Sequence, residues 1–252
     1  MAESRKVAGL ILYRGESMIG GGDIVCVATL KTNNRKTGAM VQVWILPDSG
    51  LSPLRAVQSG ENSAACGTCP LQGTYDGARI VNRVCYVNLG QAPDAVHRGL
   101  QRGIYPVFDT QSHAHLLRGR KIRLGAYGDP AALPDALLRY LVETSSGWTG
   151  YSHQLFWLAP ERASYLASFL MVSCHNPAQH KETLRRGWRP FTAIRKDEAP
   201  PAESIECPAY TRGVSCDRCG LCRGTTSKAR PVYVVAHGKV GLNLGDVQSG
   251  EM

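Results

Sequence analysis

Four cysteines within a 16-residue segment near the end of the chain have the spacing of metal ligands. Cys207, Cys216, Cys219 and Cys222 follow the pattern C-x8-C-x2-C-x2-C. A C-x2-C turn directs two sulfurs to one point, and four thiolates can bind either a tetrahedral zinc ion or a [4Fe–4S] cluster. The repeated C-x2-C step favours iron–sulfur over zinc, but spacing alone leaves both open. The glycine, aspartate and arginine residues between these cysteines are typical of a solvated loop rather than of an apolar core.

Three further cysteines form a second candidate metal site. Cys66 and Cys69 are separated by two residues, and Cys85 follows 16 residues after Cys69. Three thiolates bind a cubane cluster with one iron left open, or bind zinc together with a fourth ligand, for which Cys174 and His175 are the candidates. Cys85 could instead belong to the core. Cys26 lies inside an apolar strand pattern and reads as a small buried hydrophobe.

Polar residues follow several predicted strands where each strand ends, which is where α/β proteins place their chemistry. Asp129 comes just before Pro130 and could cap a helix there. Alternatively, Gly125 and Gly128 could let a ligand approach the backbone, with Asp129 presented to that ligand at the end of the strand. We therefore assign catalytic roles to Asp129, Tyr151, His153 and His237, and cofactor binding to Arg123, Gly125 and Gly128.

The elements that must position these residues fall into two series. Residues 7–13, 24–29 and 41–46 read as strands separated by turn formers, and residues 47–78 as a long Gly-, Ser- and Pro-rich loop. From residue 80, strand and helix patterns alternate. Strands are expected at 83–88, 121–127, 149–154, 168–173, 191–195 and 232–236, and helices at 92–102, 131–143, 161–167 and 177–186.

Six β units joined mainly by helices predict an α/β fold, a partial (βα)6-type barrel or curled parallel sheet. We expect a single domain over 1–252, with a β-rich N-terminal extension and cysteine loop at 1–79 and a βα core at 80–196. A cysteine-rich insertion at 197–230 and a last strand and tail at 231–252 complete it.

Composition narrows the class of protein. Hydrophobic residues make up 43% and charged residues 19% of the 252, which is typical of a globular chain and not of a disordered one. No apolar run reaches the roughly 18 residues of a membrane span, and the N-terminus does not resemble a secretory signal. We expect a cytoplasmic protein with no membrane partner. The net charge of +9 is compatible with a nucleic-acid or nucleotide partner.

The order of these motifs resembles a family. The chain looks like a set of uncharacterised phage and plasmid proteins, which includes a mycobacteriophage gene-product family. The motifs that carry this resemblance are Cys-x2-Cys-Pro at Cys66, Cys-Tyr-Val-Asn at Cys85, Gly128-Asp129, Trp-Thr-Gly-Tyr ending at Tyr151, and the last cysteines. The six-unit layout is also similar to the partial barrel of radical S-adenosylmethionine enzymes. That resemblance implies a three-cysteine [4Fe–4S] cluster with one iron open for S-adenosylmethionine. The usual C-x3-C-x2-C triad after the first strand is absent, because Cys66, Cys69 and Cys85 precede or begin the expected first strand.

Two functions follow as hypotheses. The first is an iron–sulfur enzyme of radical S-adenosylmethionine type acting on a nucleotide, nucleic acid or peptide, located in a bacterial host cell if a phage or plasmid encodes it. The alternative is a zinc-stabilised nucleic-acid-binding or replication-associated protein without redox chemistry, supported by basic runs at 118–123, 181–189 and 228–230.

Overall fold

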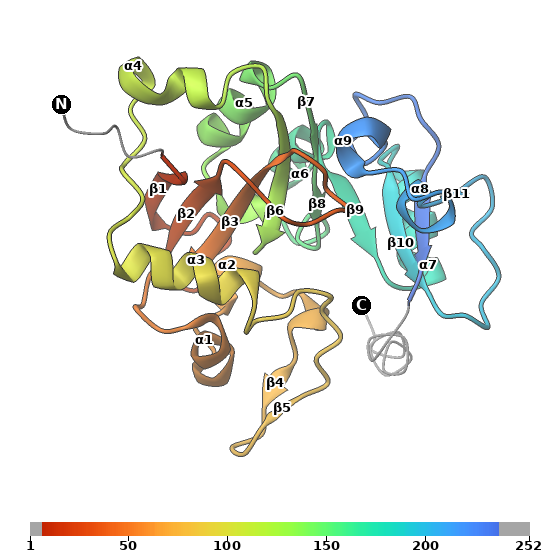
Figure 1. Ribbon diagram of the computed structural model, residues 1–252. Coiled ribbons are helices and arrows are strands. Elements are labelled where there is room, and N and C mark those ends of the chain that lie inside the picture. Colours follow the sequence, from red (N-terminus) through yellow and green to blue (C-terminus); the bar gives the residue numbers. More distant parts are fainter. Residues whose placement is uncertain (1–6, 237–252) are drawn as a thin grey trace.

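A computed structural model describes residues 7–236 (Figure 1). The chain starts with three antiparallel strands, β1 (Gly9–Glu16), β2 (Asp23–Thr29) and β3 (Val41–Pro47). Every residue of β3 is buried, as expected of a strand that lies inside a sheet and is covered on both faces.

The parallel part of the sheet begins at β3. It pairs in parallel with β6 (Lys121–Tyr127), and β6 pairs in parallel with β7 (Gly147–Thr149). After Gly150 the same chain segment continues as β8 (Tyr151–Ser152), which pairs with β9 (Met171–Cys174). The last parallel neighbours are β10 (Pro190–Ile194), β12 (Val232–Val235) and β11 (Ile205–Glu206).

The parallel strands therefore follow one another in chain order, β3, β6, β7 with β8, β9, β10 and β12, as successive βα units of one hand require. The main described strands form two five-stranded sheets, ordered β1-β2-β3-β6-β7 and β11-β12-β10-β9-β8, and Gly150 links them along the chain between β7 and β8. The Gly150 N–H donates to the Cys222 carbonyl, and its own carbonyl accepts from Met171. The strands β1 and β11 do not pair with each other, so the described strands form a mixed α/β fold that is not closed into a barrel.

Helices that follow the strands cover one face of this sheet. They are α5 (Asp135–Thr144), α6 (Pro160–Ala167) and α7 (Pro177–Arg185). Leu138 and Leu141 of α5 and Leu166 of α6 are fully buried against alternate residues of the strands, such as Leu124. This interface is the main hydrophobic core. The short turns α4 (Thr110–His113), η2 (Ala114–Leu116) and η3 (Pro130–Ala132) lead into and out of β6.

The opposite face is covered in two parts. The helix α3 (Ala92–Gln101) lies over β1–β3, where Val96 and Tyr105 pack on Val27 and Trp44. The segment with α8 (Pro208–Thr211) and α9 (Cys216–Cys219) lies over β8–β12, where Cys222 packs with Met171 and Val232. Figure 1 shows both parts in front of the sheet.

Most of the expected elements are present, and two expectations are wrong. Residues 83–88 form no strand, and the first parallel strand is β3, which pairs with β6 and so belongs to the parallel sheet rather than to a separate extension. Residues 47–78 are not structureless. They contain α1 (Pro53–Ser59), α2 (Ser63–Cys66), η1 (Pro70–Gln72) and one strand of the hairpin β4 (Thr74–Tyr75) with β5 (Ile80–Val81).

Candidate functional site

Cys66, Cys69 and Cys85, which we name the central cysteines, all lie in the segment that follows β3 in the chain. Cys66 and Cys69 flank the turn between α2 and η1, and the β4–β5 hairpin returns the chain so that the Val84 N–H donates to the Leu71 carbonyl. After burial, the charge of Cys85 contributes to raising the pKa of Cys66, and the charges of Cys66 and Cys85 contribute to raising the pKa of Cys69. All three thiols therefore interact electrostatically. The segment that carries them follows the first parallel strand, contrary to the order expected from sequence.

Burial keeps two of these thiols protonated. It raises the pKa of Cys66 to about 12 and that of Cys69 well above its usual range. Two groups oppose this effect at Cys66, namely a hydrogen bond from Asn62 and the positive charge of Arg83. A metal cation would have to displace the protons, and metal binding would therefore release them to solvent.

Gln154, just beyond β8, holds the Cys66–Thr68 turn in place. Its Nε2 donates to the Cys66 carbonyl at 3.1 Å, and its Oε1 accepts from the Thr68 N–H at 3.3 Å and from the Thr68 hydroxyl at 3.1 Å. The side chain is only 3% exposed. Gly67 has a φ of +54°, and a Cβ there would collide with the Gln154 side chain, so the turn and this glutamine fit each other closely.

A second chain of hydrogen bonds fixes the start of the same segment. The Tyr127 hydroxyl donates to Asn62 Oδ1, Asn62 Nδ2 donates to Gln72 Oε1 at 2.7 Å, and Gln72 Nε2 donates to the Gly67 carbonyl at 2.9 Å. Tyr127 is the last residue of β6, so this chain ties the cysteine turn to the neighbouring strand.

Asp129, which follows β6, lies close enough to raise the pKa of Cys66 and of Cys69. Both of its carboxylate oxygens are already used, since Oδ1 accepts from the Ala131 N–H at 2.9 Å and Oδ2 from the His153 N–H at 2.7 Å. Burial raises the pKa of Asp129 to about 6 despite these bonds. The carboxylate thus caps the short turn before α5, as the sequence suggested, and it also joins the ends of β6 and β8.

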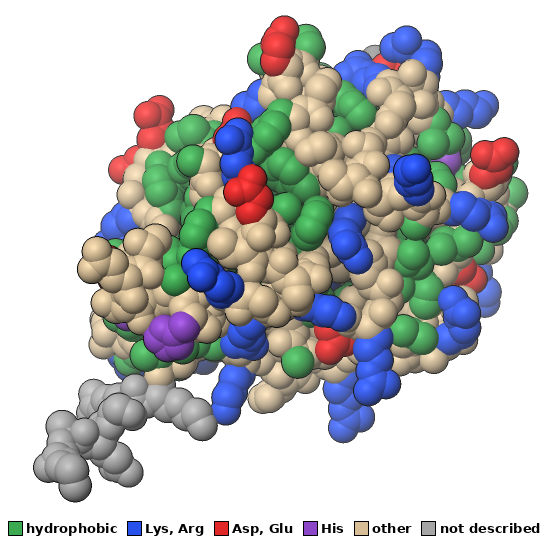
Figure 2. Space-filling model, turned by 90° about the horizontal axis from the view of Figure 1, so that it is seen from above, with side chains coloured by type: hydrophobic (Ala, Val, Ile, Leu, Met, Phe, Trp, Pro, Cys, Tyr) green, Lys and Arg blue, Asp and Glu red, His purple; other side chains and the backbone are tan. Residues whose placement is uncertain are grey.

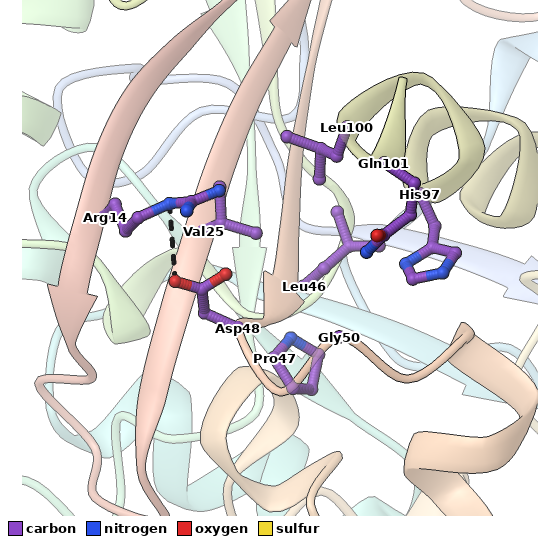
Figure 3. Close-up of a pocket in the computed structure, with 9 residues that line it drawn as sticks. All are labelled: Arg14, Val25, Leu46, Pro47, Asp48, Gly50, His97, Leu100 and Gln101. Carbon is purple, nitrogen blue, oxygen red and sulfur yellow. Dashed lines mark ion pairs between the residues drawn. The ribbon is translucent and has the colours of Figure 1, made fainter. Parts of the chain in front are cut away.

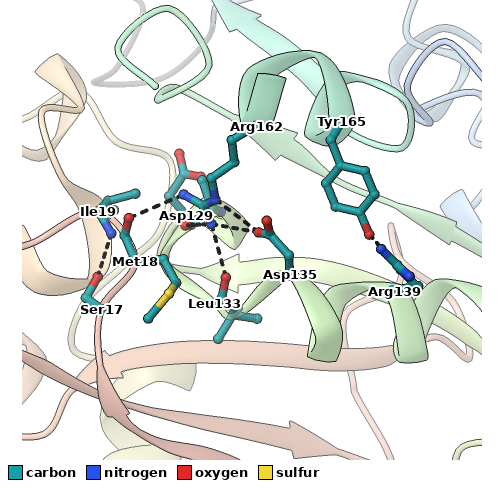
Figure 4. A network of polar contacts seen from close by, with 10 residues as sticks. Ser17, Met18, Ile19, Asp129, Leu133, Asp135, Arg139, Arg162 and Tyr165 are labelled. Atoms are coloured by element: carbon teal, nitrogen blue, oxygen red, sulfur yellow. Dashed lines mark hydrogen bonds and ion pairs between the residues drawn. The ribbon is translucent and has the colours of Figure 1, made fainter. Parts of the chain in front are cut away.

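Arg162 of α6 holds the turn that carries Asp129 (Figure 4). Its guanidinium pairs with Asp135 at 2.9 Å and donates to the carbonyls of Ala131 at 2.9 Å and of Met18 and Leu133 at 3.3 Å. One side chain therefore connects the first hairpin, the β6 turn and two helices. No motif in the sequence indicates this role, because the contacts come from segments far apart in the chain.

Two histidines follow the next two strands. His153 follows β8 and His175 follows β9, and the Nδ1 atoms of both are buried without a partner among the described residues. The Gln179 amide donates to His175 Nε2 at 3.4 Å, and its orientation is fixed because Gln179 Oε1 accepts from the His175 N–H. The ring proton of His175 therefore sits on Nδ1. Burial, and then His175, lowers the pKa of His153 to about 3, so both imidazoles are neutral at pH 7.

Cys174, the other candidate for a fourth ligand, faces a different direction. It is buried in the main core, and its sulfur lies 3.3 Å from the hydroxyl of Thr183 on α7. Cys26 is fully buried in the same core, as expected.

Arg83 is the positive charge beside the central cysteines. Its guanidinium donates to the carbonyls of Cys85 at 3.2 Å and Val87 at 2.6 Å. Residues 83–88 form no strand, and two of their carbonyls accept from this side chain rather than from a neighbouring strand. Arg83 and Cys85 also line an open cavity of about 370 Å³ whose wall includes Leu54, Ile80 and Leu89.

The four cysteines near the end of the chain also lie together. The pKa of Cys222 is raised by burial to about 12, and Cys207, Cys216 and Cys219 each contribute to this rise. The Cys216 N–H donates to the Lys36 carbonyl at 2.7 Å, which anchors the group to the loop between β2 and β3.

Arg123 and Tyr151 belong to this second group rather than to the first. The Arg123 guanidinium lies 5.7 Å from the centre of the Tyr151 ring and lowers the pKa of Cys216, and the Tyr151 hydroxyl donates to the Cys222 sulfur. Since Tyr127 neighbours Cys66 and Cys85, the two cysteine groups lie toward opposite ends of β6.

The remaining predicted residues have other surroundings. A Cβ on Gly128, whose φ is +78°, would lie 2.6 Å from the Ile45 carbonyl oxygen, and one on Gly125 would lie 2.8 Å from the Gly128 carbonyl oxygen. Protein atoms therefore occupy the space that these glycines leave, and their binding of a cofactor stays a prediction. His237 lies outside the described residues.

Within residues 7–236, no three His, Cys, Asp or Glu side chains are arranged to share a single metal ion. A second cavity, of about 200 Å³, lies between α3 and the β2–β3 strands and is lined by Arg14, Asp48 and His97, with an ion pair of 3.3 Å between the first two (Figure 3). It contains no cysteine.

Comparisons with known proteins identify no relative, since no family model, no curated protein and no solved structure matches the chain. None of the described helices has the length and apolar character needed to cross a membrane.

Proposed function

We propose that this chain is an iron–sulfur enzyme of radical S-adenosylmethionine type, with its site at the carboxyl ends of the parallel strands. The observation that supports this most is the electrostatic interaction among the thiols of Cys66, Cys69 and Cys85, which also involves Asp129. The segment that carries them follows the first of six successive parallel strands.

The residue types of the donor set suit a cubane cluster. The three thiols interact electrostatically, Cys66 and Cys69 are half-buried, and Asn62 and Arg83 stabilise the thiolate form of Cys66. Thiolates are the ligands of [4Fe–4S] clusters, and three of them leave one iron open. When bound, such a cluster would supply the electron that cleaves S-adenosylmethionine reductively to a radical able to abstract hydrogen from a substrate.

The chain's own residues would do the following. Gln154 and Asn62 keep the cysteine turn in one conformation, while Asp129 links the ends of β6 and β8. His153 and His175 offer buried ring nitrogens that lack a partner among the described residues, and a bound molecule with polar atoms could satisfy them. The proposed substrates remain a nucleotide, a nucleic acid or a peptide.

A second metal centre would be held by the four cysteines near the end of the chain, Cys207, Cys216, Cys219 and Cys222. Four thiolates suit either an auxiliary [4Fe–4S] cluster or zinc, and the cationic Arg123 near Cys216 would offset part of their negative charge. This proposed centre would either relay electrons or fasten the residue 207–222 segment to the sheet.

The test is the metal content and visible spectrum of protein purified and reconstituted without oxygen. We expect brown protein with about four or eight irons per chain. Replacing Cys66, Cys69 and Cys85 by alanine should remove about four irons and abolish S-adenosylmethionine cleavage, while Cys26→Ala should leave both unchanged. Colourless wild-type protein with one or two zinc ions would contradict the enzyme proposal and favour a zinc-stabilised nucleic-acid-binding protein.

A further inference from the structure

The charge of the molecule is concentrated at the end of the sheet opposite to the central cysteines. Three segments meet there: the loop at 31–39 between β2 and β3, residues 118–121 before β6, and residues 212–218 around α9. They carry eight basic side chains and one acidic one, Asp217. The basic residues are Lys31, Arg35, Lys36, Arg118, Arg120, Lys121, Arg212 and Arg218, and together these segments, which we name the basic face, account for +7 of the net charge of +9.

Hydrogen bonds join the three segments into one surface. Arg120 donates to the Leu30 carbonyl at 2.7 Å, the Lys121 ammonium donates to the Asp217 carbonyl, and the Asp217 carboxylate accepts from the Ala39 N–H at 3.1 Å. These bonds hold the three segments next to one another although they are distant in sequence. Figure 2 looks onto this end of the molecule, and Lys and Arg side chains gather along its lower part with few acidic ones among them.

Asp217, the one acidic residue of these segments, offsets only part of this positive charge and interacts with that of Lys121. The ion pairs found in residues 7–236 all involve other residues, such as Arg14 with Asp48 and Arg162 with Asp135. All the basic side chains of the face are exposed except that of Arg120, which is half-buried. Like charges this close repel each other, which an anionic partner would relieve.

The chemistry of the face distinguishes among anionic partners. Tyr210 is the one large exposed hydrophobic side chain beside it, since the others found in residues 7–236, such as Val107 and Trp157, lie elsewhere. A stable membrane-binding surface usually adds inserted apolar side chains to its positive charge, and a protein interface usually has an apolar centre. A nucleic-acid backbone needs only spaced cations, and an exposed tyrosine among them can contact a base. Lys36 already lies 4.0 Å from the centre of the Tyr210 ring.

We propose that the basic face binds the phosphate backbone of a nucleic acid, without base specificity. This interaction is separate from the proposed chemistry at the central cysteines and does not depend on it.

The experiment measures fluorescence anisotropy of a labelled DNA duplex of about 20 base pairs, and of a single-stranded RNA of similar length, with the metal-reconstituted full chain. If four to six phosphates are contacted, affinity should fall roughly 10²- to 10³-fold between about 50 and 200 mM salt. In Arg35→Glu/Arg118→Glu/Arg218→Glu, the slope of log K against log salt should become shallower by about 2 to 3, and binding at low salt should weaken at least ~30-fold.

The control carries the same change of charge elsewhere. Arg55→Glu/Arg79→Glu/Lys196→Glu alters exposed residues on α1, in the β4–β5 turn and after β10, and should bind like the wild type. Circular dichroism verifies that both variants are folded. Equal weakening in the two triple variants, no binding of either probe at low salt, or binding only to phosphatidylserine vesicles would overturn the proposal.

Discussion

Replacing Gln154 by methionine tests whether this one side chain holds the central cysteine turn. Methionine has nearly the same length and can fill the same buried space, but it cannot replace the three hydrogen bonds to Cys66 and Thr68. At about 1 kcal/mol net for each bond, and with the Cys66 carbonyl and the Thr68 N–H left without partners, we expect the free energy of unfolding to fall by about 2 to 4 kcal/mol.

Urea unfolding followed by tryptophan fluorescence measures this change. For a chain of this size, a loss of that amount lowers the midpoint by roughly 1 M at an unchanged slope. Hydrogen exchange adds local information, because peptides covering residues 62–72 should exchange faster in the variant, whereas those from β10 should change only as far as global stability does. The control is Gln58→Met on α1, whose side chain contacts the exposed Arg55 at 3.2 Å and should change stability by less than about 0.5 kcal/mol.

Gln154→Met should also change metal binding at the central cysteines. If the turn must be ordered for Cys66 and Cys69 to bind together, Gln154→Met should lower metal retention at that group without affecting Cys207–Cys222. Unfolding and local exchange equal to those of wild type would show that the turn is held by other contacts, and the positioning role of Gln154 would be withdrawn.

Three other perturbations have outcomes that follow from the same contacts. Gly128→Ala should destabilise the protein by at least about 2 kcal/mol in thermal or urea unfolding, because its φ is +78° and its Cβ would meet the backbone oxygen of Ile45; a stable variant would mean that the turn can shift. Arg162→Met should lower the free energy of unfolding by about 2 to 4 kcal/mol. Arg139→Met should lower it by less than about 1 kcal/mol, since the Arg139 guanidinium donates to the Tyr165 hydroxyl at the surface. Equal losses in the two variants would refute the role of Arg162 shown in Figure 4. The pKa of His153 is about 3 in the folded protein and 6.5 in the unfolded chain, so the unfolded state binds the extra proton. Stability should therefore be lost as pH falls from 6.5 toward 3, by on the order of 4 kcal/mol. His153→Gln should flatten this dependence in urea unfolding across that range, and an unchanged profile would show that His153 is not buried as a neutral ring.

Elements whose signals are local were predictable. The strand 121–127 and the helices near 92–102, 161–167 and 177–186 were found within a few residues, because their apolar periods are regular and each of these helices has proline in its first turn. At the start of α7 a capping residue adds to this signal, since the Asn176 side chain accepts from the Gln179 N–H at 2.8 Å.

The position of the first parallel strand depends on signals that are not local. Residues 83–88 have a strand-like pattern but form no strand, and the carbonyls of Cys85 and Val87 accept from the Arg83 guanidinium instead. Residues 41–46 were expected to be a strand, and one signal was overlooked there: a nearly continuous apolar run is typical of a strand covered on both faces, as parallel strands are. The hairpin-like turns before it suggested a separate antiparallel unit instead.

In the candidate site, too, local features could be predicted from the sequence and non-local ones could not. Cysteine spacing is a local property, and the thiols within each of the two groups named from it interact electrostatically, while metal binding by either group stays a prediction. The residues that surround the thiols, Asn62 and Arg83 in particular, come from packing and hydrogen bonding between distant segments, which one sequence does not reveal. Arg123 and Tyr151 were assigned to the cavity from their strand positions, yet they neighbour Cys216 and Cys222 because they lie at the other end of the sheet.

The position of β3 changes what the spacing of Cys66, Cys69 and Cys85 means. As part of an N-terminal extension they would lie outside the βα series, but as the segment that follows its first strand they occupy the edge where successive parallel strands end. The 15 residues between Cys69 and Cys85 are then not an interruption of the motif, since the β4–β5 hairpin returns the chain to the same place. The carboxyl end of the sheet carries Cys66, Cys69, Cys85 and the imidazoles that lack a partner among the described residues. The amino end carries the second cysteine group together with the excess of positive charge. An extended anion held at the amino end would lie apart from the chemistry proposed for the central cysteines, so variants of the basic face and variants of Cys66, Cys69 and Cys85 alter different parts of the molecule.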